Sequence, residues 1–486
     1  MPKGDARRLW LAVAAVALGA VVLRALASSG TELYGDEAYY YLWSLRPAAG
    51  YFDHPPLVAW LIAAGKALVP GELGVRLLFL LAGGLGAVFA ALLARELLGE
   101  GEEGAPRAIL SAALLAASAP LFHLLGALAL PDAPLAVAYT AALWLFARAR
   151  GTRFLWAGLS VGVALLAKYT AALLAPALLL LVFLDPELRR ELATPFPWLG
   201  ALLATALFAP CLAWNAAHGF VSLRFQLGHG FGGEASLRSV AEYLVGQLLG
   251  CGPVALLVGL AFLLRARTSP ERRVAAAVLL PLAVTTLSAL RGRVEANWPS
   301  LVYPALCAAA AVGLARGSRA LARALLLAST VAGFGLLALF ASVERAPGLF
   351  LGTPAVERFH GWRDAAILVR ERAERACRKL GCDGEQPFLF TDSYQTAGEL
   401  AFYGGFRRFG PAAERPSQLD LWGDRPRPGE PFLFVGPGRA AASPRRTFRA
   451  EGEQPTERVE ASFGGRALRD LAVTPFARYV GEAPRS

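Results

Sequence analysis

The sequence predicts a polytopic α-helical membrane protein with a small soluble α/β domain at its C-terminal end. Of its 486 residues, 56% are hydrophobic and only 17% are charged, whereas a soluble domain carries about a quarter charged residues. Apolar runs of about 20 residues, the length that crosses a bilayer, recur throughout residues 1–342. Residues 343–486 are less hydrophobic and are expected to form the soluble domain.

The apolar runs divide into about eleven expected membrane spans. These lie at residues 9–28, 76–98, 107–126, 131–147, 153–166, 169–184, 196–215, 240–264, 273–290, 297–315 and 319–341. The apolar stretch 154–184 is too long for one span, so we expect two short helices that turn at Lys168.

The lysine and arginine residues indicate how the spans are oriented. Most of them cluster at one set of span ends, and the positive-inside rule places those ends, together with the N-terminus, in the cytoplasm. An odd number of spans then places the domain 343–486 and the acidic loop 29–75 on the extracytoplasmic side. The net charge of +11 follows from this topology and from contact with anionic lipid, so no nucleic-acid partner is expected.

The first outer loop carries the strongest candidate site. Asp36 and Glu37 precede apolar residues at helical spacing, and Asp53 and His54 precede a proline pair that suits a helix start. Two helices lying on the membrane surface would therefore each present acidic groups at the N-terminal end. Plain helix capping is the alternative, because the helix dipole favours anions there. Two acid sites, a histidine and several tyrosines in one loop favour a catalytic role.

Other polar residues are expected at the same outer face. Asp132 begins a span, where it could also cap the helix. Lys168 lies in an apolar run, where a charge is costly and usually functional, although its long side chain could reach the surface instead. The remaining candidates for contacts with substrate are Tyr40, Arg224, His229, Arg293, Glu295 and Asn297. Arginine suits phosphate because its planar fork donates two parallel hydrogen bonds.

Nucleotide-binding motifs are absent from the sequence. There is no GxxxxGK[ST] loop and no dinucleotide fingerprint after a strand. No nucleotide cofactor is therefore expected, and a lipid-borne substrate entering from the bilayer is the natural alternative.

The C-terminal domain shows a mixed α/β pattern. Residues 362–380 and 396–403 are expected to be helical, and residues 388–391 and 432–435 to be short buried strands. Residues 411–431 and 436–460 are rich in Pro, Gly and Arg and are expected to be loops. Cys377 and Cys382 would form a disulfide in an oxidising compartment or remain free thiols.

Several motifs resemble those of bacterial membrane glycosyltransferases of the protein O-mannosyltransferase superfamily. These enzymes have the GT-C fold and include glycosyltransferase family 39 and the lipid A aminoarabinose transferases. The motifs are Asp36-Glu37, Tyr51-Phe-Asp-His-Pro-Pro-Leu-Val-Ala-Trp60, Pro131-Asp-Ala-Pro-Leu135, Leu166-Ala-Lys-Tyr-Thr170, Trp214-Asn-Ala-Ala-His-Gly219 and Glu295-Ala-Asn-Trp-Pro299. The resemblance covers roughly residues 1–340.

The resemblance implies an inverting transfer from a polyprenyl-phosphate sugar, such as an undecaprenyl-phosphate sugar, to a lipid, glycan or protein acceptor. It implies a multi-pass protein of the bacterial inner membrane. Asp36 would be the critical acid, with Glu37, Asp53 and Asp132 as further catalytic groups. Asp53 and His218 are candidate ligands of a divalent metal ion.

Two positions depart from the aminoarabinose transferases. His54 stands where those enzymes have a lysine that contacts the donor phosphate, and Tyr39 stands where they have an arginine. The sugar and the acceptor therefore stay open at this point.

The chemistry fits the residues. Breaking a sugar phosphoester needs cations on the leaving phosphate, for which Lys168, Arg224 and Arg293 are candidates, and a carboxylate near the nucleophile. A polytopic transporter or lipid flippase is the alternative function. Transporters usually show internal repeats, whereas this sequence shows no clear repeat and gathers its polar groups at one face.

Overall fold

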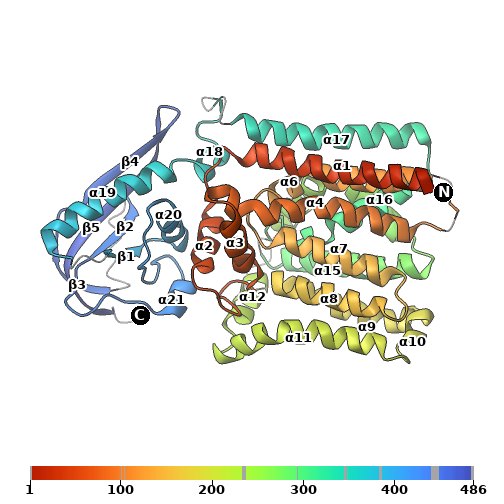
Figure 1. Ribbon diagram of the computed structural model, residues 1–486, viewed down its shortest axis with the longest axis horizontal. Coiled ribbons are helices and arrows are strands. Elements are labelled where there is room, and N and C mark those ends of the chain that lie inside the picture. The colour runs from red at the N-terminus through yellow and green to blue at the C-terminus, as the bar shows by residue number, and fades with distance from the viewer. Residues whose placement is uncertain are drawn as a thin grey trace.

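The computed structural model describes residues 3–99, 101–102, 104–231, 237–292, 294–343, 346, 349–382, 386–438 and 448–482. A bundle of helices and a smaller mixed α/β part lie end to end along the long axis of the molecule (Figure 1). The two short helices of the first loop lie where the two parts meet, so this loop contacts both of them.

The bundle is built from helices in the following order. They are α1 (Lys3–Ser28), α2 (Gly35–Ser44), α3 (Leu57–Leu68), α4 (Gly71–Leu97), α5 (Ala105–Ser118), α6 (Pro120–Leu125), α7 (Asp132–Ala147), α8 (Arg153–Ala167), η1 (Tyr169–Leu173), α9 (Leu174–Leu184), α10 (Pro186–Glu191), α11 (Phe196–Ala217), α12 (Val221–Phe231), α13 (Leu237–Cys251), α14 (Pro253–Leu263), α15 (Ser269–Ala289), η2 (Trp298–Val302), α16 (Tyr303–Ala315) and α17 (Arg319–Ser342).

A polytopic helical membrane protein is confirmed, but the expected count of eleven spans is not. In the described part of the chain, 6 helices are long and apolar enough to cross a membrane, or 7 if a bent pair forms one span. Several expected spans are shorter apolar helices of 10–17 residues, among them α5, α7 and α8.

Two breaks in the bundle show how the sequence interrupts its apolar runs. The turn expected at Lys168 is confirmed, because α8 ends at Ala167 and Lys168 is extended, with φ −157° and ψ 140°. The apolar run expected as a span at 240–264 is broken into two helices, because α13 and α14 meet at an angle of 101°. Gly252 has φ 90° there, and Pro253 lacks the N–H that would continue the helix.

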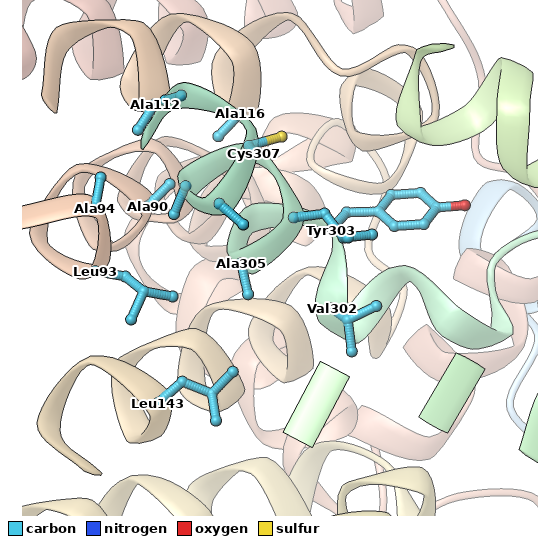
Figure 2. Packing of buried hydrophobic residues seen from close by; sticks show 14 of the residues in the cluster. Ala90, Leu93, Ala94, Ala112, Ala116, Leu143, Val302, Tyr303, Ala305 and Cys307 are labelled. Atoms are coloured by element: carbon cyan, nitrogen blue, oxygen red, sulfur yellow. The ribbon is translucent and has the colours of Figure 1, made fainter. Parts of the chain in front are cut away.

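The core of the bundle is formed by small side chains around α16. Ala305 and Cys307 of this helix are buried, and Cys307 lies beside Ala112 and Ala116 of α5 (Figure 2). Small residues let helix backbones approach closely, which stabilises helix packing in a membrane where lipid is as apolar as the side chains. This packing fixes the positions of the loops at the bundle ends.

The C-terminal part carries helices and a five-stranded sheet. Its elements are α18 (Pro354–Phe359), α19 (Trp362–Leu380), β1 (Phe388–Thr391), α20 (Tyr394–Tyr403), α21 (Gln418–Trp422), β2 (Phe432–Pro437), β3 (Phe448–Glu453), β4 (Glu457–Phe463) and β5 (Arg466–Glu482). The order is β1-β2-β5-β3, with β4 also paired to β5. β1 and β2 are parallel, and the other pairs are antiparallel.

The expected small α/β domain is confirmed, with one error of detail. The predictions of α19, α20 and the first two strands are correct, and Cys377 and Cys382 form a disulfide. The loops expected at 411–431 and 436–460 instead contain α21, β3 and β4, although residues 439–447 lie outside the described part. The outer faces of β3 and β4 carry charged residues, so their composition is that of a loop.

The C-terminal part docks on the first loop through two helices. α20 packs on α2 so closely that a Cβ added to Gly398 would lie 2.4 Å from the backbone carbon of Ala38. Only glycine fits this position, and the close approach brings residues of α20 next to the acids of the first loop.

Candidate active site

A cavity of about 610 Å³ lies where the bundle meets the C-terminal part. Its polar wall includes Asp36, Asp53, Asp132 and Lys168, which were predicted site residues on four separate segments. Its apolar wall is formed by the leucines at positions 121, 124, 125, 128 and 130, on α6 and the segment after it. The cavity therefore combines acids, cations and an apolar surface.

Asp36 lies in the first turn of α2 and faces the cavity. Its Oδ1 atom accepts a hydrogen bond of 2.8 Å from Nε2 of Gln395, on α20. Burial raises the pKa of Asp36, although the hydrogen bond from Gln395 opposes this change. A carboxylate in this setting is a stronger base than a solvated one.

Asp53 is held by residues from both parts of the protein. The hydroxyl of Tyr39 donates to its Oδ2 atom at 2.9 Å, and the guanidinium of Arg415 lies 3.0 Å from Oδ1. The backbone N–H of Gln418 in turn donates to Tyr39 Oη at 2.7 Å. Burial raises the pKa of Asp53, and Arg415 acts in the opposite direction.

Asp132, Lys168 and Asn297 are brought together on the bundle side of the cavity. Lys168 Nζ lies 2.8 Å from Oδ1 of Asp132, with side chains only 7% and 2% exposed. Asn297 donates to the other carboxylate oxygen at 3.1 Å, and Ser300 lies 3.4 Å from Oδ1. Asp132 and Lys168, which were predicted from separate motifs, thus form one buried ion pair.

Glu37 does not line the cavity, and the catalytic role predicted for it does not fit its placement. Arg76 donates to both of its carboxylate oxygens, at 2.9 and 2.7 Å. The backbone N–H groups of Tyr34 and Ala129 donate to them as well, at 2.9 and 2.8 Å. Glu37 therefore ties α2 to α4 and to the segment before α7, leaving Asp36 as the acid that faces the cavity.

The other predicted site residues divide into two groups. Tyr40, His54 and Glu295 line the cavity, and the rings of Tyr40 and His54 meet edge to face at 5.9 Å. Burial raises the pKa of Tyr40 well above its ordinary value. Arg224 is exposed on α12 and does not line the cavity. The side chain of His229 and all of Arg293 lie outside the described residues.

The predicted metal ligands do not fit a metal site. His218 is exposed, stacks on Trp214 with ring centroids 4.1 Å apart, and does not line the cavity. Both carboxylate oxygens of Asp53 are engaged by Tyr39 and Arg415. Within the described ranges, no three His, Cys, Asp or Glu side chains are grouped as metal ligands.

Comparison with known proteins finds a partial match to one family and a similar curated protein. Residues 53–214 match the family of dolichyl-phosphate-mannose-protein mannosyltransferases. A lipid A galacturonosyltransferase of Rhizobium johnstonii is 27% identical over 291 residues, which are 57% of this chain and 59% of that protein. This chain therefore spans less than two thirds of the length of the relative it matches.

Solved structures match nearly the whole chain. ArnT from Cupriavidus metallidurans in the apo state has a TM-score of 0.65 and 18% identity, covering 97% of this chain and 98% of ArnT. The same protein bound to undecaprenyl phosphate has a TM-score of 0.64 and 16% identity, with 98% of each chain covered. This chain has the GT-C fold. The resemblance predicted from the motifs is thereby confirmed.

The GT-C fold extends to more distant proteins. The oligosaccharyltransferase AglB from Archaeoglobus fulgidus, in complex with an inhibitory peptide and a dolichol-phosphate, has a TM-score of 0.53 and 16% identity. The match covers 89% of this chain and 70% of AglB. Both ArnT and AglB were thus solved with a polyprenyl phosphate, the class of lipid that was expected as the sugar carrier.

Part of the GT-C cavity was missed by the sequence analysis. Tyr394, Gln395 and Arg415 of the C-terminal part line it, as does Arg358 of α18. The guanidinium of Arg415 lies 4.3 Å from the ring centroid of Tyr394 and 5.2 Å from that of Phe225. Arg415 lies in a segment rich in Pro, Gly and Arg, where neither spacing nor composition distinguishes it from its neighbours.

Proposed function

We propose that this protein transfers a sugar from a polyprenyl-phosphate donor to an acceptor on the extracytoplasmic face of the membrane. The observation that carries the proposal is the cavity of about 610 Å³, which joins carboxylates, cations and a leucine wall within a GT-C fold. The structure of ArnT with undecaprenyl phosphate supports this class of donor.

The donor phosphate is assigned to the cations of the cavity. Lys168 and Arg415 are ion-paired to Asp132 and Asp53, whereas Arg358 forms no direct ion pair with a described carboxylate and acts on Asp36 only from a distance. Arg358 is therefore the cation most available to a new anion, and Lys168 and Arg415 add positive charge around it. Preorganised cations of this kind stabilise the charge that develops on a leaving phosphate. The leucine wall suits the isoprenoid chain.

The reaction is a single displacement that inverts the anomeric carbon. An acceptor hydroxyl oxygen attacks that carbon from the face opposite the phosphate, and its proton passes to the carboxylate of Asp36. The bond from the anomeric carbon to the phosphate oxygen breaks, and the phosphate leaves with the electron pair. Burial raises the pKa of Asp36, which strengthens it as a base, and the hydrogen bond from Gln395 orients it.

The acceptor is proposed to be a lipid A-like glycolipid. The support is the name of the R. johnstonii relative, a lipid A galacturonosyltransferase. The aromatic residues Tyr34, Tyr40, Trp298 and Tyr394 also line the cavity. Aromatic side chains with a few placed polar groups are typical of small-molecule binding sites, and they would leave room for a sugar ring beside Asp36.

The test is a transfer assay with purified protein in detergent. The protein is incubated with lipid A and with undecaprenyl phosphate carrying radiolabelled galacturonic acid, aminoarabinose or a neutral hexose. We expect label to enter lipid A and undecaprenyl phosphate to be released with one of these donors, and not with an Asp36→Asn variant. Release of undecaprenyl phosphate without labelled lipid A would keep the donor and overturn the acceptor. No release from any donor would overturn the proposal.

A further inference from the structure

A second pocket lies at the end of the bundle away from the C-terminal part. We propose that this pocket binds a phosphate-bearing anion, which goes beyond the proposed sugar transfer. It has a volume of about 500 Å³ and is lined by Arg148, Arg267, Arg272 and Arg316. The loops that form it lie at the opposite end of the molecule from the sheet (Figure 1).

Three turns of the bundle contribute the four arginines of the pocket. Arg148 follows α7, Arg267 lies between α14 and α15, Arg272 lies in the first turns of α15, and Arg316 follows α16. Two carboxylates, Glu102 from the loop before α5 and Glu187 of α10, also line the pocket. Because the arginines come from turns that are far apart in the sequence, the fold itself concentrates their charge at one place.

Two of the arginines are fixed by the protein. Arg316 lies 2.7 Å from Glu102 and 3.1 Å from Glu271. Arg148 donates to the backbone carbonyl groups of residues 96 and 98, at 2.9 and 2.7 Å. These contacts hold both guanidinium groups at the edge of the pocket and make it a preformed site.

The other two arginines have charge that the described residues do not neutralise. Arg267 and Arg272 form no ion pair with a carboxylate in the described part of the chain. Arg272 donates only to the carbonyl of Arg267, at 2.5 Å, and to Oγ of Ser269, at 3.4 Å. Its Nε atom is buried and has no acceptor there. Buried donors nearly always have a partner, so an anionic oxygen in the pocket would complete the site.

Phosphate is the anion that this arrangement fits. The guanidinium fork matches two oxygens of one phosphate group, and the hydroxyls of Thr268 and Ser269 line the same pocket. The headgroup of an anionic phospholipid and free phosphate share this chemistry. The side chains of Leu257 and Leu264, on and just after α14, are 58% and 72% exposed, and such apolar surface next to Arg267 would contact acyl chains.

The test measures lipid retention by native mass spectrometry. Wild-type protein and its variants are equilibrated in micelles that contain phosphatidylglycerol and phosphatidylcholine, and the bound lipids are counted. We expect wild type to retain phosphatidylglycerol, and Arg267→Gln and Arg267→Gln/Arg272→Gln to bind it at least about tenfold more weakly. The matched control is Arg319→Gln/Arg323→Gln, because these exposed arginines of α17 lie at the same end and outside the pocket.

The outcomes separate the possible sources of the phosphate. Displacement of phosphatidylglycerol by millimolar inorganic phosphate supports a phosphate site filled by a soluble anion, and retention supports a lipid headgroup site. The proposal is overturned if the control Arg319→Gln/Arg323→Gln loses phosphatidylglycerol to the same extent. It is also overturned if wild type shows no preference for phosphatidylglycerol over phosphatidylcholine. Arg267 is exposed, so Arg267→Gln should fold normally. If the double variant unfolds, lipid binding by this single variant tests the proposal. Asp36→Asn should retain the lipid, so failure of the proposed sugar transfer is read separately.

Discussion

The guanidinium of Arg415 lies 3.0 Å from Oδ1 of Asp53, although the two residues are separated by 362 positions in the sequence. This ion pair joins the C-terminal part to the first loop and places a cation from one at the acid of the other. Tyr394 stacks beneath the same guanidinium at 4.3 Å. The cavity is therefore a shared product of both parts, and neither part contains it alone.

Replacing Arg415 with glutamine should reduce release of the polyprenyl phosphate by about 10²-fold, since small displacements in an active site have effects of this size. The change leaves Asp53 buried with only its hydrogen bond from Tyr39. Arg415→Lys should restore part of the activity if charge is what matters. Arg458→Gln is the matched control, because Arg458 pairs with Asp470 on the exposed face of the sheet. Unchanged turnover in Arg415→Gln would contradict the role.

Asp36→Asn should lower transfer by about 10²–10⁴-fold, the usual effect of losing a general base. The change is nearly isosteric, and Gln395 can still donate to the amide oxygen, so the protein should fold normally. Asp364→Asn is a suitable comparison, because Asp364 also lies in the first turn of a helix but is exposed outside the cavity. Parental turnover by a folded Asp36→Asn protein would rule out Asp36 as the base.

The pH dependence of transfer should report Asp36. Burial raises the pKa of this carboxyl, and the hydrogen bond from Gln395 lowers it in part. The base works only when deprotonated, so activity should rise with pH through the raised pKa and be lost below it. Gln395→Leu removes the hydrogen bond and should move this acid limb to higher pH, as measured by initial rates across a pH series. A limb that stays in place or moves to lower pH would show that another group controls it.

Removing Lys168 should destabilise the protein as well as weaken binding of the donor phosphate. Lys168→Ala leaves Asp132 charged and buried, and breaking one side of such a pair costs about 3–5 kcal/mol in the free energy of unfolding. The double variant Lys168→Met/Asp132→Leu should recover most of that loss, because no unpaired charge remains. Thermal unfolding in detergent measures both. If the losses in stability of Lys168→Met and of Asp132→Leu, each measured alone, add up to the loss in the double variant, the ion pair contributes little.

The sequence predicted the elements better than the directions of their side chains. Asp36 and Glu37 are neighbours in the same helical turn, and spacing assigned both of them to catalysis. Successive helix residues point about 100° apart, because a turn has about 3.6 residues, so only one could face the cavity. Arg76 of α4 binds Glu37 and so leaves Asp36 to face the cavity, and the local sequence does not indicate this contact.

The remaining errors have similar causes. The break at Gly252-Pro253 carries a turn signal, but the apolar run around it favoured one continuous span. Arg415 had no local signal at all, since it became a site residue only when the C-terminal part docked on α2. Motifs predicted the residues contributed by the bundle, and tertiary contacts determined those contributed by the C-terminal part.

The orientation of the site is the last prediction. The positive-inside rule places the C-terminal part and the cavity outside the cytoplasm. Single cysteines at Ser462 of β4 and Ser318, which precedes α17, suit this test because both residues are exposed and lie at opposite ends of the molecule. The native cysteines are removed from the background. A membrane-impermeant maleimide should label Ser462→Cys on spheroplasts, whereas Ser318→Cys should require permeabilisation.

Between Ser318 and the C-terminal part that carries Ser462 lies α17, a helix of 24 residues that is long and apolar enough to cross the membrane. Labelling of both without permeabilisation would therefore mean that α17 does not cross it. Reversed labelling would place the cavity in contact with the cytoplasm, where nucleotide sugars are available, and the argument for a lipid-linked donor would lose its support. The expected pattern instead leaves the donor to reach Asp36 through the bilayer, with its isoprenoid chain against the leucine wall.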